Sequence, residues 1–130
     1  TDAGIRHFSG TATYAKRFAL PQGARQHGER LILDLGSVRE IAAVRLNGKP
    51  VGLRWAEPYE VDITDHVRGG DNDLEVDVTN LWVNRMIGDE IAKETGETIS
   101  FTVFPVYRKD SPLLPSGLLG PVRIKVLSSR

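Results

Sequence analysis

Apolar and polar residues alternate along much of the chain, and this alternation is its strongest structural signal. In the run 31–35, Leu31, Leu33 and Leu35 share one side, whereas Ile32 and Asp34 lie on the other. Successive side chains of a β-strand point to opposite faces, so each run buries one side and exposes the other to water. The same alternation returns in three further runs: 42–46, 74–79 and 122–126. This pattern predicts antiparallel sheets that pack in two layers.

Turn residues separate the alternating runs and support the same architecture. Asn47-Gly48 lies between two apolar runs and favours a tight β-hairpin, because both turn positions adopt positive φ. Residues 69–72 predict a second turn before the strand that contains Leu74. Two polar or Pro/Gly-rich stretches predict loops: 21–28, after a strand at 11–20, and 112–120, before the last strand.

Helical signal is scarce. Residues 62–67 predict a single turn with Asp62 or Thr64 as its cap, and residues 88–93 predict another. Both segments are too short to build a helical layer. The sequence therefore predicts an all-β, two-layer antiparallel β-sandwich, formed as one domain over residues 1–130.

Composition excludes several classes of function. Lys plus Arg number 17 and Asp plus Glu number 17, so no general field draws the chain to nucleic acid or to an anionic membrane. Cysteine is absent, which excludes disulfides and thiolate metal sites. No apolar run approaches the roughly 20 residues of a membrane helix. We expect no nucleic-acid or membrane partner, and a monomer when the domain is isolated.

The residues of a catalytic site are not evident in the sequence. The three histidines (His7, His27 and His66) lie far apart, and the chain has no nucleophile elbow, no HExxH pair and no phosphate-binding glycine loop. Paired carboxylates are the remaining enzymatic hypothesis, with Asp89 acting together with Glu57 or Glu60 as in glycoside hydrolysis. Most acidic residues instead alternate onto exposed strand faces or occupy caps and turns.

Residues 80–89 combine amide, indole, guanidinium and carboxylate side chains directly after a strand. Carbohydrate sites use an aromatic face for the C–H side of a sugar ring and planar polar groups for its hydroxyls. The alternative is structural: Trp82 fills the end of the sandwich, and Arg85 pairs with Asp89 to fix the loop. Both hypotheses stay open for five candidate sugar-binding or domain-contact residues: Asn80, Trp82, Asn84, Arg85 and Asp89.

A second aromatic cluster follows the predicted hairpin. Trp55 and Tyr59 flank the end of a strand, where an aromatic ring can stack on a sugar or close the core. We expect Tyr59 to be buried and Trp55 to be the more exposed candidate. Residues 71–73 (Asp-Asn-Asp) are rich in oxygen ligands but lack further ligands nearby, so we expect a turn and no cofactor, with a structural calcium ion as the open alternative.

Five short motifs, taken in order, resemble the galactose-binding-like jelly-roll domain of the β-galactosidase and β-glucuronidase family of glycoside hydrolases. The motifs include Tyr-Ala-Lys-Arg-Phe and the Asn-Gly hairpin, and their positions are 14–18, 33–36, 43–52, 58–64 and 70–76. Three flanking segments look like the C-terminal jelly roll of large bacterial α-L-rhamnosidase-type enzymes: 4–14, 79–89 and 116–122. Together these segments extend the resemblance over nearly the whole chain.

The resemblance implies a non-catalytic accessory domain within a larger multidomain hydrolase. In such enzymes the catalytic carboxylates belong to a separate barrel, and the jelly roll packs beside it and lends a loop or binds sugar. The implied partners are therefore that catalytic domain and carbohydrate, and the implied location is the bacterial periplasm or outside the cell. The resemblance also implies structural roles for Asn47-Gly48 in the hairpin, Asp62 and Thr64 in the following turn, and Asn72 in the next.

The competing hypothesis is a purely structural sandwich that docks on another domain and binds no sugar. An apolar strip near the Pro-rich loop supports docking, because exposed apolar patches often mark interfaces. The residues of this strip are Leu113, Leu114, Leu118 and Leu119.

Overall fold

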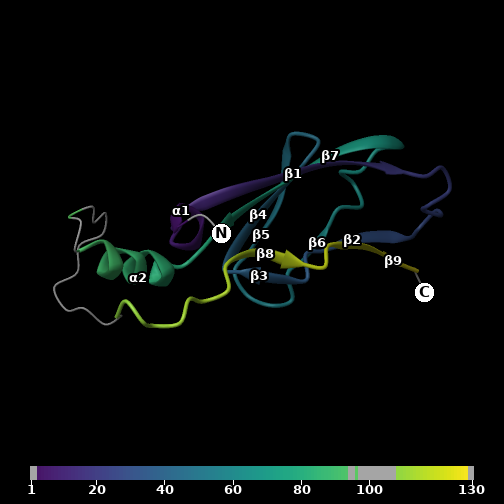
Figure 1. Cartoon of the computed structure of the whole chain (residues 1–130). Helices are drawn as coiled ribbons and strands as arrows, with labels where there is room; N and C mark the ends of the chain where they lie inside the picture. Colours follow the sequence, from purple (N-terminus) through teal and green to yellow (C-terminus); the bar gives the residue numbers. More distant parts are fainter. Residues whose placement is uncertain (1–2, 94–95, 97–107, 129–130) are drawn as a thin grey trace.

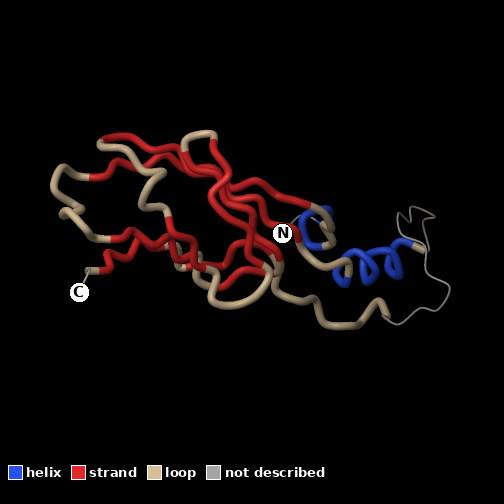
Figure 2. Tube along the Cα trace, turned by 180° about the vertical axis from the view of Figure 1, so that it is seen from behind, coloured by secondary structure: helices blue, strands red, loops and turns tan. Residues whose placement is uncertain are grey.

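A computed structural model describes residues 3–93, 96 and 108–128. Antiparallel strands form two facing layers, and a short helical extension projects from one end of them (Figures 1 and 2). The described chain is mostly strand, which confirms the predicted all-β sandwich.

The first layer, sheet A, is four-stranded in the order β1-β7-β4-β5. Its strands are β1 (Thr11–Leu20), β7 (Gly70–Thr79), β4 (Ile41–Leu46) and β5 (Lys49–Arg54). β1 and β7 pair along their full length, from Thr11 opposite Thr79 to Leu20 opposite Gly70. This pairing brings the two ends of the described chain segment 11–79 into one sheet.

The second layer, sheet B, has the order β6-β2-β9. Its strands are β6 (Glu60–Asp62), β2 (Arg30–Asp34) and β9 (Arg123–Leu127). A smaller sheet pairs β3 (Ser37–Arg39) with β8 (Gly117–Gly120). β3 follows β2 and β8 precedes β9, so this pair extends sheet B towards the helical end.

The core lies between the two layers and contains the residues that the alternation predicts. In β4 and β7 every second residue is buried, as the run 42–46 and the run 74–79 require. Burying one such side chain contributes roughly 1.5–3 kcal/mol. The core residues are Leu31, Leu33, Leu35, Val38, Ala42, Val44, Leu46, Tyr59, Val61, Ile63, Leu74, Val76 and Val78.

The prediction for one strand face is wrong. Ile32 and Asp34 were expected on the exposed side of their strand, yet both are buried. The neighbours of Ile32 across the sheet are Asp62 and Lys125. A lysine such as Lys125 can cover apolar surface with its aliphatic stem while its ammonium stays in water, so a position beside it on a sheet need not be exposed.

The predicted turns are confirmed by their hydrogen bonds. Asn47 and Gly48 both adopt positive φ in the β4–β5 hairpin. The N–H of Thr64 donates to Asp62 Oδ1 at 2.9 Å and closes the turn after β6. Asn72 is fully buried, and its Nδ2 donates to the carbonyl of Gly70 at 2.9 Å.

The outer face of sheet A carries a ladder of polar pairs. Arg17 donates to Asp73 Oδ1 at 2.8 Å, and Arg45 bridges Glu75 and Asp77 at 2.7 Å each. Exposed ion pairs of this kind contribute about 0–1 kcal/mol each. This face is therefore polar and in contact with water.

Two expectations about the last third of the chain are wrong. The single helical turn expected at 88–93 is a ten-residue helix, α2 (Val83–Ala92), which packs near the short helix α1 (Ala3–Arg6). The loop expected at 112–120 contains strand β8, which pairs with β3 and not with a sequence neighbour. Within the described residues, no helix is long and apolar enough to cross a membrane.

Candidate functional site

The helical end of the domain begins at Asn80, directly after β7. Its side-chain Oδ1 accepts from the N–H of Gly10 at 2.9 Å, and its Nδ2 donates to the carbonyl of Phe8 at 2.7 Å. The N–H of Asn80 in turn donates to the carbonyl of Gly10 at 3.1 Å. Asn80 thereby clamps the segment that joins α1 to β1.

Asn84 forms a second amide clamp one turn further on. Its Nδ2 donates to the carbonyl of Leu114 at 2.8 Å, and its Oδ1 accepts from the Leu114 N–H at 2.8 Å. Asn84 is buried, so this pair of bonds fixes the stretch before β8 against the first turn of α2.

Arg85 and Asp89 pair one turn apart along α2, as the structural hypothesis expected. Both side chains are largely buried, and an ion pair of this kind is costly to break because it leaves a buried charge. Arg85 Nε is buried without a hydrogen-bond partner among the described residues. The ion pair therefore lies inside the helical end and stabilises α2 there.

A close approach joins α1 to α2. A Cβ built on Gly88 would lie 2.5 Å from Cγ of His7, so only glycine allows the histidine to sit against the helix. His7 is itself buried. This contact explains why α2 folds back onto the start of the chain.

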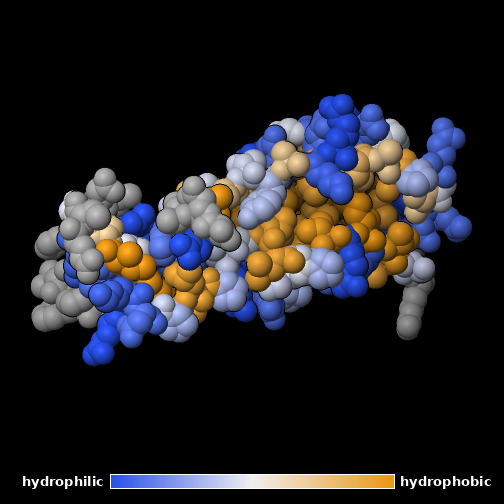
Figure 3. All heavy atoms as spheres, viewed as in Figure 1, coloured by the Kyte–Doolittle hydropathy of each residue, from blue (hydrophilic) through white to orange (hydrophobic). Residues whose placement is uncertain are grey.

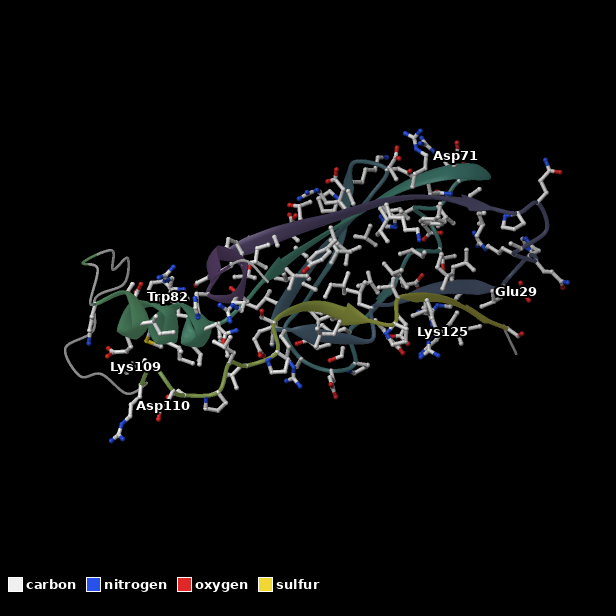
Figure 4. All side chains as sticks on the ribbon, in the orientation of Figure 1. Glu29, Asp71, Trp82, Lys109, Asp110 and Lys125 are labelled. Atoms are coloured by element: carbon white, nitrogen blue, oxygen red, sulfur yellow. The ribbon has the colours of Figure 1, made fainter. Side chains whose placement is uncertain are left out.

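Trp82 does not fill the end of the sandwich, and that expectation is wrong. Its side chain is 65% exposed at the start of α2, where Figure 4 labels it. Other large apolar side chains of the helical end are exposed as well. We call this set of exposed side chains the helical-end patch: Ile5, Phe8, Leu81, Trp82, Ile91, Leu113 and Leu114.

The second aromatic pair divides as predicted. Trp55 is 70% exposed in the β5–β6 connection. Tyr59 is buried in the core, and its hydroxyl donates to the carbonyl of Glu40 at 2.5 Å. Burial raises the pKa of this phenol above its usual range. Tyr59 is thus a core residue, while Trp55 keeps a free aromatic face.

A hollow of about 360 Å³ opens where the helical end meets the sandwich. Aromatic rings of Phe8 and Tyr14 line it together with the polar residues Asn80 and Ser116. Asn80 was a candidate from the sequence, whereas Phe8, Tyr14 and Ser116 were missed. The one available signal was their position in the segments 4–14 and 116–122.

A second, wider hollow of about 460 Å³ is acidic and is lined by Asp34, Glu57 and Glu60. Lys125, labelled on β9 in Figure 4, lies 3.0 Å from Asp34 and 2.6 Å from Glu60. The Gly36 N–H and the Lys125 ammonium hold the pKa of Asp34 below its usual range. Asp34 therefore stays ionised at neutral pH, which suits an ion-pair partner better than a general acid.

The oxygen-rich turn 71–73 is engaged in other contacts. The side chain of Asn72 turns inward, and Asp73 pairs with Arg17. Across the residues that the structure describes, no group of three or more His, Cys, Asp or Glu side chains is arranged to hold a metal ion.

The sequence model of one protein family matches this chain over residues 5–110. That family is described as the galactose-binding domain-like family of glycosyl hydrolase 2. The chain belongs to this family. The galactose-binding-like domain inferred from the five motifs is thus confirmed.

Relatives place the galactose-binding-like domain inside much longer proteins. A protein of Formosa agariphila assigned as a beta-glucuronidase is 44% identical, with the match covering 95% of this chain and 13% of that protein. The structure of a rhamnosidase from Novosphingobium sp. PP1Y is 49% identical with a TM-score of 0.86, over 95% of this chain and 11% of that one. A beta-glucuronidase from an uncultured Clostridium sp. is 35% identical over 62% of this chain and 14% of its own, with a TM-score of 0.56.

The matched part of the chain therefore spans only 11–14% of the length of these relatives. It corresponds to an accessory domain of glycoside hydrolases and not to a complete glycosidase. The wider match to the rhamnosidase includes the helical end, whereas the match to the Clostridium enzyme covers 62% of the chain.

Proposed function

We propose that this galactose-binding-like domain is the accessory domain of a large glycoside hydrolase, and that its helical-end patch packs against the catalytic domain of that enzyme. The observation that carries the proposal is the exposure of Trp82 among other large apolar side chains at one end of the domain. Apolar patches of this kind mark interfaces more often than free surface.

The polar groups of the helical end support docking over independent sugar binding. The amides of Asn80 and Asn84 each donate one hydrogen bond to the backbone and accept another from it, and Arg85 is paired with Asp89. A sugar site needs free planar polar groups to accept and donate to hydroxyls. The helical end therefore presents mainly apolar surface to a partner, and the hydrogen bonds of Asn80 and Asn84 hold the backbone beneath it.

The test uses the 130-residue chain and the remainder of the hydrolase as two separate proteins, with binding measured by titration calorimetry. Trp82→Ser is expected to weaken binding about tenfold or more, because a tryptophan at the centre of an interface typically contributes over 1 kcal/mol. Trp55→Ser is the matched control, since both indoles are exposed to a similar degree. Equal affinities for the two variants would refute docking through the helical end.

Sugar binding is the second candidate function, and the hollow beside Phe8 and Tyr14 favours it. Aromatic rings that line a pocket suit the C–H faces of a sugar ring, and Ser116 adds an exposed polar group. The probes are rhamnose and glucuronic acid, chosen from the relatives' names. Binding of each sugar is measured by NMR as changes in the chemical shifts of the domain. Saturable shifts at Phe8 and Tyr14 would support a sugar site, and no shift at millimolar sugar would exclude independent binding.

A further inference from the structure

The two main sheets contain unequal numbers of strands. Sheet A has four strands in the order β1-β7-β4-β5, and sheet B has three in the order β6-β2-β9. β5 contacts β6 at one side of the sandwich, and β7 contacts β8, which leads into β9. Counting across from β5, β1 lies beyond the three strands of sheet B, and near Tyr14 it meets β8, where the Leu118 N–H donates to the Tyr14 hydroxyl at 3.4 Å.

The side chains on this side of the sandwich are only partly covered. Val126 faces inward beside Leu31, its neighbour across the sheet, yet Val126 is 45% exposed while Leu31 is fully buried. Tyr14 on β1 is 40% exposed, although it lies opposite the buried Val76. Figure 3 shows an apolar surface between β1 and β8–β9. We call this surface the open flank and define it by Tyr14, Phe18, Leu20, Leu118, Ile124 and Val126.

The backbone beside the open flank also has an edge that no described strand pairs with. β9 is hydrogen-bonded to β2 along one edge, and none of the described strands pairs with its other edge. A free edge presents a row of N–H and C=O groups that readily accept another strand. Peptide segments bind such edges by adding a strand, with alternate side chains filling the apolar surface. The flank therefore favours an extended occupant over a helix.

We propose that an extended segment of the larger hydrolase, outside residues 1–130, adds to the free edge of β9 and lies opposite β1 as the fourth strand of sheet B. The inference rests on the proposed function, because the occupant comes from the hydrolase polypeptide. Relatives of this domain carry about nine-tenths of their length outside the matched part. A strand on the same polypeptide gains from a high effective concentration.

The flank also specifies the chemistry of the occupant. The inward side chains of the occupant are apolar, because they cover Phe18 and Val126. Lys16 lies between Tyr14 and Phe18 on the inward row of β1 and is exposed, so an acidic side chain in the occupant complements it. The segment therefore alternates apolar residues with polar ones and carries a carboxylate on its inward side.

The test compares Val126→Asp with Leu127→Asp in the whole hydrolase and in the 130-residue chain. The two residues are adjacent on β9 and equally exposed in the domain, at 45% and 44%, but only Val126 points into the open flank. Amide hydrogen exchange across β9 is the readout. In the hydrolase, Val126→Asp is expected to raise exchange about tenfold or more over Leu127→Asp, because it buries a carboxylate under the added strand.

In the 130-residue chain alone the two variants are expected to differ by less than about twofold, since both positions face water there. Equal exchange of the two variants in the hydrolase would overturn the proposal. A dimer of the 130-residue chain that Val126→Asp breaks and Leu127→Asp keeps would also overturn it, by making a second copy the occupant. If Val126→Asp fails to fold in the hydrolase, Val126→Thr and Leu127→Thr provide the same comparison.

The readout is independent of catalysis. A hydrolase polypeptide without glycosidase activity would refute the proposed function while leaving the comparison of the two variants unaffected.

Discussion

The clamp between Asn84 and Leu114 makes the support of the helical-end patch directly testable. Asn84→Leu keeps the size of the side chain but removes two hydrogen bonds, each 2.8 Å long. Each bond contributes about 1 kcal/mol, so the opening of the segment around Leu114 becomes easier by about 2 kcal/mol, or roughly 30-fold in its equilibrium constant. The measurement is the exchange rate of the Leu114 amide hydrogen by NMR, which is expected to rise by that factor.

The matched control is the second clamp. Asn80→Leu removes the corresponding bonds to Gly10 and Phe8, so it is expected to accelerate exchange of the Gly10 amide and leave Leu114 protected. An unchanged Leu114 amide in Asn84→Leu would refute the clamp. So would a response of both amides to either variant, because that result would mean the helical end opens as one unit.

Three further predictions concern stability. Asn72→Ala removes four hydrogen bonds from a fully buried amide and is expected to lower the free energy of unfolding in urea by about 3–4 kcal/mol; a loss below about 1 kcal/mol would contradict this. Hydrogen bonds from the Thr64 hydroxyl and N–H, followed by Arg30, lower the pKa of Asp62 to about 2, below its unfolded value, so the advantage of Asp62 over Asp62→Asn is present above about pH 4 and disappears as the pH falls towards 2. Urea midpoints across that range measure it, and a constant difference would argue against it. Gly88→Ala places a methyl group against His7 and is expected to shift the His7 ring resonances towards those of a solvated histidine; unchanged resonances would count against the contact.

The sandwich was predictable because strand periodicity is a local property. The alternation at 42–46 and 74–79 identifies the buried face of β4 and β7 without knowledge of their partners. Asn47-Gly48 likewise defines its hairpin from two residues alone. These features depend on the side-chain period and on turn chemistry, both of which are written in adjacent residues.

The helical end was not predictable in the same way. α2 is stabilised by contacts with His7 and Leu114, which are distant in sequence, and β8 exists because it pairs with β3. The sequence marks Asn80 and Asn84 as candidate sugar-binding or domain-contact residues, but their hydrogen-bond partners are 70 and 30 residues away. Residue type alone does not separate an amide that binds sugar from one that clamps a backbone segment.

The two tryptophans provide the most direct test of the proposal that the helical end docks on a catalytic domain. Both are exposed in the domain, Trp82 at 65% and Trp55 at 70%, so oxidative footprinting should modify them at similar rates in the 130-residue chain. In the whole hydrolase the account predicts that oxidation of Trp82 falls about tenfold or more while Trp55 is unchanged, as expected when one of two exposed indoles enters an interface. Oxidation of Trp82 at the same rate in the hydrolase and in the isolated chain would contradict the account.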